Sequence, residues 1–290
     1  MLTAIEFMLA PFVVCLLLIG INIYFGIHVI KREIIFIDIA LAQIAALGGT
    51  IAGILHDLLP SSAEHAHNEH TIWWYLFAIG FTTAAALLFS LLKSRRLSLP
   101  LESLIGIAYA VAATGAVVIL DKAAGGELHV HDMVAGSILW VNWHQITVLF
   151  FVFALIGLFH FKFRKKFFAL TDAYNDENTY YHFWWDFLFY ATFGIAVVFS
   201  VQVGGILTIF AFLIIPASTS ALFSNKWSTR ILFGWGLGTI VTVCGLYLSW
   251  AMDVPSSPTV ILFLGVFLLL AILVRRLGIL EFLVDGGKNI

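Results

Sequence analysis

Two histidine-rich segments carry the side chains best suited to bind a metal ion. Residues 64–70 read Glu-His-Ala-His-Asn-Glu-His, and the candidate ligands there are Glu64, His65, His67 and His70. The second segment contributes His129, His131 and Asp132. Imidazole nitrogens and carboxylate oxygens suit zinc and neighbouring divalent metals. Together the segments could form a mouth that collects metal; the alternative is a pair of solvated polar loops with incidental histidines.

Two further polar side chains lie inside a long apolar run. Asp38 and Gln43 are five residues apart, which places them about 140° apart around a helix, so they do not share one face. Ionisable groups inside a membrane are costly and usually face a cavity or a partner. Asp38 could line a transport path, or it could start a helix or pair with Lys31 or Arg32. Gln43 could line the same path or form an interhelical hydrogen bond.

The composition decides which class of protein must position these residues. Of 290 residues, 61% are hydrophobic and 11% are charged, whereas a soluble domain is about 25% charged. These values exclude a soluble enzyme and a disordered chain, and they indicate an integral membrane protein. The net charge of −2 provides no basic field for nucleic acid. No ATP-binding motif is present, because Gly286-Gly287-Lys288-Asn289 lacks the upstream glycine and the hydroxyl of a phosphate loop, so we do not expect an enzyme.

A membrane helix needs about 20 mostly apolar residues, and this scale predicts an all-α polytopic bundle. The nine candidate spans cover residues 7–29, 35–56, 73–92, 102–120, 143–161, 185–200, 204–223, 231–250 and 258–275. Only Val-Gln-Val-Gly-Gly separates the sixth from the seventh, so eight spans are the alternative if one of these is broken or re-entrant. Residues 1–290 read as a single transmembrane domain.

Lysine and arginine predict the orientation. If nine spans alternate, all but one of the 15 basic residues fall on one side, and Lys122 is the exception. Basic loops stay in the cytoplasm, so we expect the N-terminus outside, the C-terminus inside and a location in the cell (inner) membrane. The histidine-rich loop, about residues 57–71, then lies outside. The polar stretch of about residues 162–184 lies inside, as an amphipathic surface helix or a docking site for a cytoplasmic partner.

Four sequence blocks resemble the permease subunits of the ABC importers for zinc and manganese, the ABC-3 family. Residues 31–43 read Lys-Arg-Glu-Ile-Ile-Phe-Ile-Asp-Ile-Ala-Leu-Ala-Gln, and a glycine follows at Gly48. Residues 203–217 begin Val-Gly-Gly-Ile and end Leu-Ile-Ile-Pro-Ala, which is the most specific match. Residues 253–260 resemble the proline-rich segment before the family's last span, and residues 103–107 are a weaker match.

The first block departs from the family pattern. In an ungapped alignment Ile39 takes the position of the family's Asp, and Gln43 takes the position of its His. The family's Asp/His pair, four residues apart on one helix face, is therefore not reproduced. Either a local irregularity brings Asp38 into the pathway, or the metal site within the membrane differs.

The resemblance implies a permease that forms the translocation pathway as a homodimer. It also implies cytoplasmic ABC ATPase subunits, an extracytoplasmic metal-binding protein and a transported Zn(II) or Mn(II) ion, with no permanently bound cofactor. Residues 162–184 are then the expected contact with the ATPase. A gradient-driven secondary metal transporter and a non-transporting membrane metal sensor are the alternatives.

Overall fold

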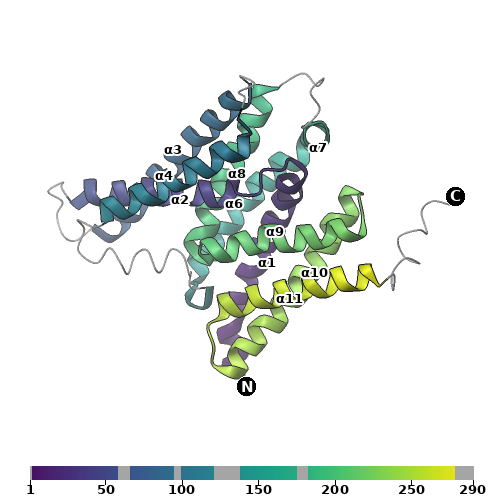
Figure 1. The fold of residues 1–290 in the computed structure, drawn as a ribbon. Helices are drawn as coiled ribbons and strands as arrows, with labels where there is room; N and C mark the ends of the chain where they lie inside the picture. Colours follow the sequence, from purple (N-terminus) through teal and green to yellow (C-terminus); the bar gives the residue numbers. More distant parts are fainter. Residues whose placement is uncertain (1, 58–65, 95–98, 121–137, 175–181, 278–290) are drawn as a thin grey trace.

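The computed structural model describes residues 2–57, 66–94, 99–120, 138–174 and 182–277, and this part of the chain is almost entirely helical (Figure 1). Its helices are α1 (Leu2–Lys31), α2 (Ile37–Asp57), α3 (Ala66–Ser94), α4 (Leu101–Leu120), the short 3-10 helix η1 (Ile138–Trp140), α6 (Trp143–Lys162), α7 (Arg164–Asp172), α8 (Phe183–Gly204), α9 (Ile206–Phe223), α10 (Trp227–Met252) and α11 (Ser256–Arg276). Within these described ranges, nine helices are long and apolar enough to cross a membrane, all of them except α7 and η1. The predicted all-α architecture with nine spans is confirmed.

Local sequence explains where several of these helices begin and end. The side chain of Asn142 accepts a hydrogen bond from the backbone of Gln145 at 2.9 Å, and the Gln145 side chain accepts one from the backbone of Asn142 at 3.0 Å. This reciprocal pair satisfies backbone donors that would otherwise be unpaired at the start of α6. Between α8 and α9, Gly205 has a φ of 74°, a conformation that strongly favours glycine, and a single residue therefore ends one helix and starts the next. Each of the two helices is long enough to span by itself, with 22 and 18 residues.

One end of the bundle collects the basic helix termini, and we call it the basic end. Lys31 at the end of α1 is ion-paired with Asp172 at the end of α7, and Lys93 near the end of α3 is ion-paired with Asp186 in the first turn of α8. These contacts place the ends of α1 and α3, the start of α8, and α7 side by side. This grouping agrees with the predicted alternation of nine spans. That the basic end faces the cytoplasm stays the prediction made from the charge distribution.

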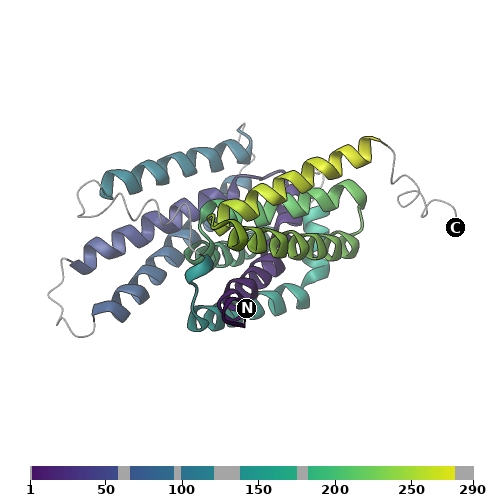
Figure 2. The same ribbon diagram turned by 90° about the horizontal axis from the view of Figure 1, so that it is seen from below.

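The core forms around α1, which packs against α9, α10 and α6 (Figures 1 and 2). A second group of α2, α3 and α4 joins this core mainly through α8. Gly26 permits the closest approach, because a Cβ built there would lie 1.9 Å from the carbonyl oxygen of Leu213 in α9. Small residues let membrane helices pack with their backbones close together. The outer faces of α4, α6 and α11 remain apolar and exposed, as lipid-facing surfaces require.

The predicted third span, residues 73–92, agrees with the apolar part of α3, which covers Ile72–Lys93. The helix itself begins earlier, at Ala66, so the expectation that His67 and His70 lie in a loop was wrong, and both belong to its first two turns. The sequence from Ala66 to residue 72 contains neither proline nor glycine, and nothing in it interrupts helix propagation. Glu64, His65, His129, His131 and Asp132 lie outside the described residues.

Candidate transport pathway and the buried polar cluster at its basic end

Asp38 lies in the first turn of α2, close to the basic end. It is 2% exposed, and its Oδ1 accepts a hydrogen bond from the backbone N–H of Ile39 at 2.7 Å. A carboxylate at a helix N-terminus is favoured by the helix dipole, which fits the predicted alternative of a helix-start residue. Among the described residues, no lysine or arginine lies within ion-pair distance of Asp38, so the expected salt bridge with Lys31 or Arg32 is not formed.

Gln43 is half-buried and lies about one and a half turns further along α2. The helix is continuous from Ile37 to Asp57, so no irregularity brings Asp38 and Gln43 onto one face. The two side chains therefore lie on different faces of α2, as their spacing predicts, and a place for Asp38 in the pathway stays a prediction. A metal site within the membrane that differs from the family's Asp/His pair remains a prediction.

Arg32, one of the two cations that could have paired with Asp38, instead pairs with Asp186 across the bundle. Its guanidinium donates to the Asp186 carboxylate at 2.8 Å, and the two side chains are 0% and 3% exposed. Lys93 binds the other carboxylate oxygen at 3.2 Å. One buried carboxylate thus holds two cations, which joins the ends of α1 and α3 to the start of α8. Removing the Asp186 carboxylate would leave both cations without their partner, and breaking a buried pair in this way typically costs about 3–5 kcal/mol.

Thr171 connects the buried ion pair of Arg32 and Asp186 to helix α7. Its hydroxyl oxygen accepts a hydrogen bond from Arg32 Nε at 2.9 Å and lies 2.7 Å from His28 Nδ1. A hydroxyl can accept one bond and donate another, so Thr171 can satisfy both residues at once. We call His28, Arg32, Lys93, Thr171 and Asp186 the anchoring cluster.

Aromatic rings enclose the anchoring cluster. The Arg32 guanidinium lies 3.9 Å from the ring centroid of Phe189, and Lys93 Nζ lies 3.0 Å from that of Tyr174. Rings at these distances attract the cations and keep water away from them. Burial also raises the pKa of Tyr174 to about 12, although the nearby Arg32 charge opposes the shift, so this phenol stays neutral at physiological pH.

The helix α7 lies within the predicted segment 162–184. Phe167 and Thr171, four residues apart, are buried against the bundle, whereas Arg164, Lys165 and Lys166 are exposed. A helix with this pattern lies on a surface with one face packed and one face free. The prediction of an amphipathic helix is thereby confirmed for Arg164–Asp172.

A second buried chain of hydrogen bonds lies next to the cluster. The hydroxyl of Tyr24 lies 2.9 Å from His160 Nδ1, and His160 Nε2 lies 2.8 Å from the hydroxyl of Thr192. The His160 ring also stacks on Phe167 of α7 at 4.2 Å between centroids. Both ring nitrogens therefore have partners within the protein, and the residue holds α1, α6, α7 and α8 together.

Sequence reasoning missed the anchoring cluster, although one signal pointed to it. Asp186 is a lone carboxylate just inside an apolar span, and such a residue needs a partner. The sequence does not say that the partners come from residues 93 and 32, which are far away along the chain. Within the described ranges, no three His, Cys, Asp or Glu side chains converge as a metal cluster.

Comparison with known proteins agrees with this architecture. The model of the ABC 3 transport family matches residues 4–275. The chain is 26% identical over 162 residues to "Manganese transport system membrane protein MntC" of Listeria monocytogenes, covering 54% of this chain and 56% of that one. It is 35% identical over 72 residues to "High-affinity zinc uptake system membrane protein ZnuB" of Buchnera aphidicola, covering 25% and 28% of the two chains. The chain thus spans about half the length of the first relative and about a quarter of the second.

A solved structure has the same fold over nearly the whole chain. It is "PsaBC from Streptococcus pneumoniae in complex with Fab", with a TM-score of 0.76, 18% sequence identity, and coverage of 97% of this chain and 98% of that one. At this level of identity the likeness concerns the fold alone. The family match, by contrast, extends over almost the entire sequence and confirms the resemblance found in the sequence blocks. This multi-pass membrane protein belongs to the ABC 3 transport family.

Proposed function

We propose that the chain is the membrane-spanning permease subunit of an ATP-driven importer of a divalent metal, Zn(II) or Mn(II), in the cell (inner) membrane. The family match and the nine candidate spans support the role of a permease. The names of the relatives, which mention manganese and zinc transport, support the choice of metal. Two copies of the chain would form the pathway, and an extracytoplasmic protein would deliver the metal to the outer loops.

The observation that carries this proposal is the attachment of α7 to the transmembrane helices. Through Thr171 and the Arg32–Asp186 ion pair, α7 is bonded to α1 and α8, and Lys93 extends the contact to α3. A cytoplasmic ATPase that pushes or pulls on the free face of α7 would therefore move three membrane helices together. Such rigid-body movement is how many transporters change their accessibility.

The free face of α7 has the chemistry for a partner that binds through charge. Lys165 and Lys166 are exposed beside the buried Phe167, so an ATPase with acidic residues in its docking groove would fit. ATP hydrolysis would then belong to the partner, and this chain would supply the pathway. Asp38 and Gln43 would contact the passing ion, and the segments around residues 64–70 and 129–132 would concentrate it outside.

The experiment that tests the proposal is purification of the tagged chain in a mild detergent, with mass spectrometry of what stays bound. Recovery of an ATPase with a phosphate-loop motif, in roughly equal amount, would support an ABC importer. Replacing Lys165 and Lys166 by glutamate should release the ATPase while the chain stays in the membrane. Recovery of the chain without any ATPase under several gentle detergents would favour the gradient-driven transporter or the metal sensor.

A further inference from the structure

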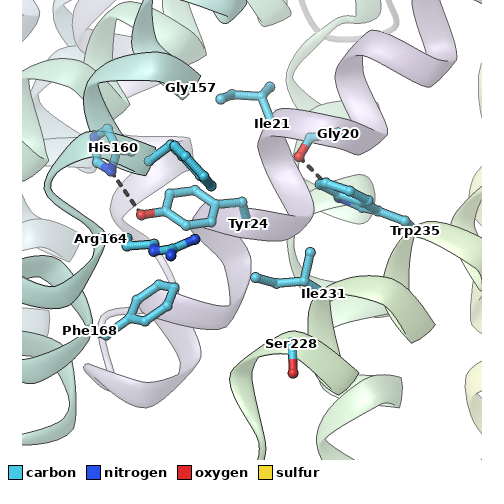
Figure 3. A pocket seen from close by; sticks show the side chains of 11 residues that line it. Gly20, Ile21, Tyr24, Gly157, His160, Arg164, Phe168, Ser228, Ile231 and Trp235 are labelled. Atoms are coloured by element: carbon cyan, nitrogen blue, oxygen red, sulfur yellow. Dashed lines mark hydrogen bonds between the residues drawn. The ribbon is translucent and has the colours of Figure 1, made fainter.

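An apolar groove of about 350 Å³ lies between α6 and α10, with α1 as its floor (Figure 3). Each wall is one face of a helix. On α10 the lining residues follow a spacing of three and four positions, and the same is true of α6 and the start of α7. Among the lining residues are Gly20 and Tyr24 in α1, Gly157 in α6, Arg164 at the start of α7, and Ser228 and Trp235 in α10.

The groove is within the depth of the membrane and ends at the basic end of the bundle. Gly20 is eleven residues before the last residue of α1, whereas Ser228 is in the first turn of α10 and Arg164 starts α7. The groove therefore runs from the middle of the spanning segments to their boundary. It is partly open, and a lipid molecule beside the bundle could enter it.

Most polar atoms along the groove already have partners. Trp235 Nε1 donates to the carbonyl oxygen of Gly20 at 3.1 Å, and the Tyr24 hydroxyl pairs with His160 at 2.9 Å (Figure 3). The walls therefore offer an apolar surface along the length of the groove. Such a surface would favour a hydrocarbon chain over a water-soluble ligand.

Arg164 is different, because it brings a charge to the end of the groove. Its guanidinium lies 4.6 Å from the ring centroid of Phe161, and no carboxylate in the described part of the chain is within ion-pair distance. Lys162, Lys165 and Lys166 are close in sequence and are exposed as well. Guanidinium groups bind phosphate through paired hydrogen bonds, and clusters of lysine and arginine attract anionic lipids.

We propose that this groove binds one anionic phospholipid from the leaflet at the basic end. An acyl chain lies along the apolar walls beside Trp235 and Gly157, and the headgroup phosphate binds Arg164. The proposal does not depend on the transported metal or on the ATPase. It adds a lipid-binding site to the proposed function, and a permease or a sensor could equally carry it.

The test uses the full chain, purified and exchanged into mixtures of phosphatidylglycerol and phosphatidylcholine, with native mass spectrometry of the retained lipid. We expect one phosphatidylglycerol per chain to survive removal of detergent, in clear preference to phosphatidylcholine. Arg164→Gln should abolish the preference, and Arg276→Gln, which removes the same charge from a residue that does not line the groove, should retain it. Gly157→Leu should fill the groove and release the lipid, because a Cβ there meets no atom within 4 Å and the backbone can accept it.

Gly265→Leu is the matched control for the groove-filling variant. Gly265 is in α11, away from the groove, and a Cβ there also meets no atom within 4 Å. Equal retention of both lipids by the wild-type chain would overturn the proposal, since it would indicate ordinary boundary lipid. So would retention of phosphatidylglycerol by Gly157→Leu at the wild-type level.

A second measurement covers the case in which Gly157→Leu does not fold. Brominated acyl chains quench tryptophan fluorescence, and the difference between the wild-type chain and Trp235→Phe isolates the signal of Trp235. In vesicles with equal small fractions of either brominated lipid, phosphatidylglycerol should quench this signal more strongly than phosphatidylcholine. Equal quenching by both would contradict the headgroup selectivity. Quenching by neither would mean that a second copy of the chain, rather than lipid, covers the groove.

Discussion

Arg32 and Asp186 form an ion pair 2.8 Å long that is buried from both sides, although 154 positions separate them in the sequence. The pair joins the residue that directly follows α1 to the first turn of α8. Lys93 adds a second cation to the same carboxylate, and Thr171 adds a bond from α7.

Arg32→Gln should strongly destabilise the protein. The substitution removes the hydrogen bonds that Arg32 makes to Asp186 and Thr171, while Lys93 still neutralises the carboxylate. We therefore expect a loss toward the lower end of the range of about 3–5 kcal/mol that breaking a buried pair typically costs. Thermal unfolding of the purified chain and its abundance in the membrane measure the effect. Arg276→Gln, at the exposed end of α11, is the control and should change neither quantity. Equal thermal stability of the two variants would contradict the role given to the buried pair.

Thr171→Val should separate assembly from transport. Valine keeps the shape of threonine but leaves Arg32 Nε and His28 Nδ1 without their partner, and an unsatisfied buried group costs about 1–3 kcal/mol. We expect the chain to retain the proposed ATPase, because the free face of α7 is unchanged, while metal uptake falls. Thr171→Ser keeps the hydroxyl and should restore uptake. Uptake by the valine variant at the wild-type level would show that the hydroxyl does not couple α7 to the bundle.

Asp38→Ala and Gln43→Ala should each reduce metal uptake without reducing the amount of protein in the membrane. If either side chain contributes about 1.4 kcal/mol to binding of the passing ion, uptake at limiting metal falls about tenfold. Elemental analysis of loaded cells provides the measurement. Gln202→Ala is a suitable control, because Gln202 is an exposed amide near the end of α8. Normal uptake in both variants would remove Asp38 and Gln43 from the pathway.

Gly26→Ala should disrupt packing, whereas Gly20→Ala on the same helix should be tolerated. A Cβ at Gly26 would meet the Leu213 carbonyl oxygen at 1.9 Å, which forces α1 and α9 apart. A Cβ at Gly20 meets no atom within 4 Å, and alanine favours a helix over glycine by about 1 kcal/mol. Comparing the thermal unfolding of the two variants tests the close approach. Similar stability in both would mean that α1 and α9 are less tightly packed than the structure has them.

Zinc binding by the histidine-rich segments should depend on pH. At about pH 7.5 imidazoles are neutral and can coordinate metal, whereas at about pH 5.5 most are protonated and compete with it. Hydrogen exchange of residues 57–71 and 127–132 should therefore slow with micromolar zinc at the higher pH and much less at the lower. If zinc changes the rate of hydrogen exchange at neither pH, the histidines of these segments do not bind the metal.

The sequence predicted the helical architecture well, because the cost of unpaired backbone groups in lipid leaves little choice of structure. Runs of about 20 apolar residues therefore locate the spans. The positive charges of Lys31, Lys93 and Lys162 indicate which span ends lie on the same side. Boundaries next to polar residues were less certain: Ala66 starts α3 earlier than the apolar run, since helix formation tolerates polar residues such as His67 and His70.

The candidate site could be predicted only in part. Asp38 and Gln43 were identified by the rarity of polar groups in spans, but their neighbours depend on how helices cross. The pairing of Arg32 with Asp186 rather than with Asp38 illustrates the reason. Asp38 is closer to Arg32 along the chain. The packing of the helices, however, places the Asp186 carboxylate of α8 within hydrogen-bond distance of Arg32. Pairing across helices is a property of the tertiary fold that spacing along one helix cannot reveal.

Gly205 has a mechanical consequence for the molecule. Helix α8 has 22 residues, which gives a rod about 33 Å long at a rise of about 1.5 Å per residue. Asp186 holds one end of this rod, and the single residue Gly205 joins the other end to α9. A tilt of about 5° at the held end would carry the far end through about 3 Å, given that rise per residue. With no loop between the helices to absorb the displacement, such a tilt would move α9 as well, and α8 would then act as a lever across the bundle.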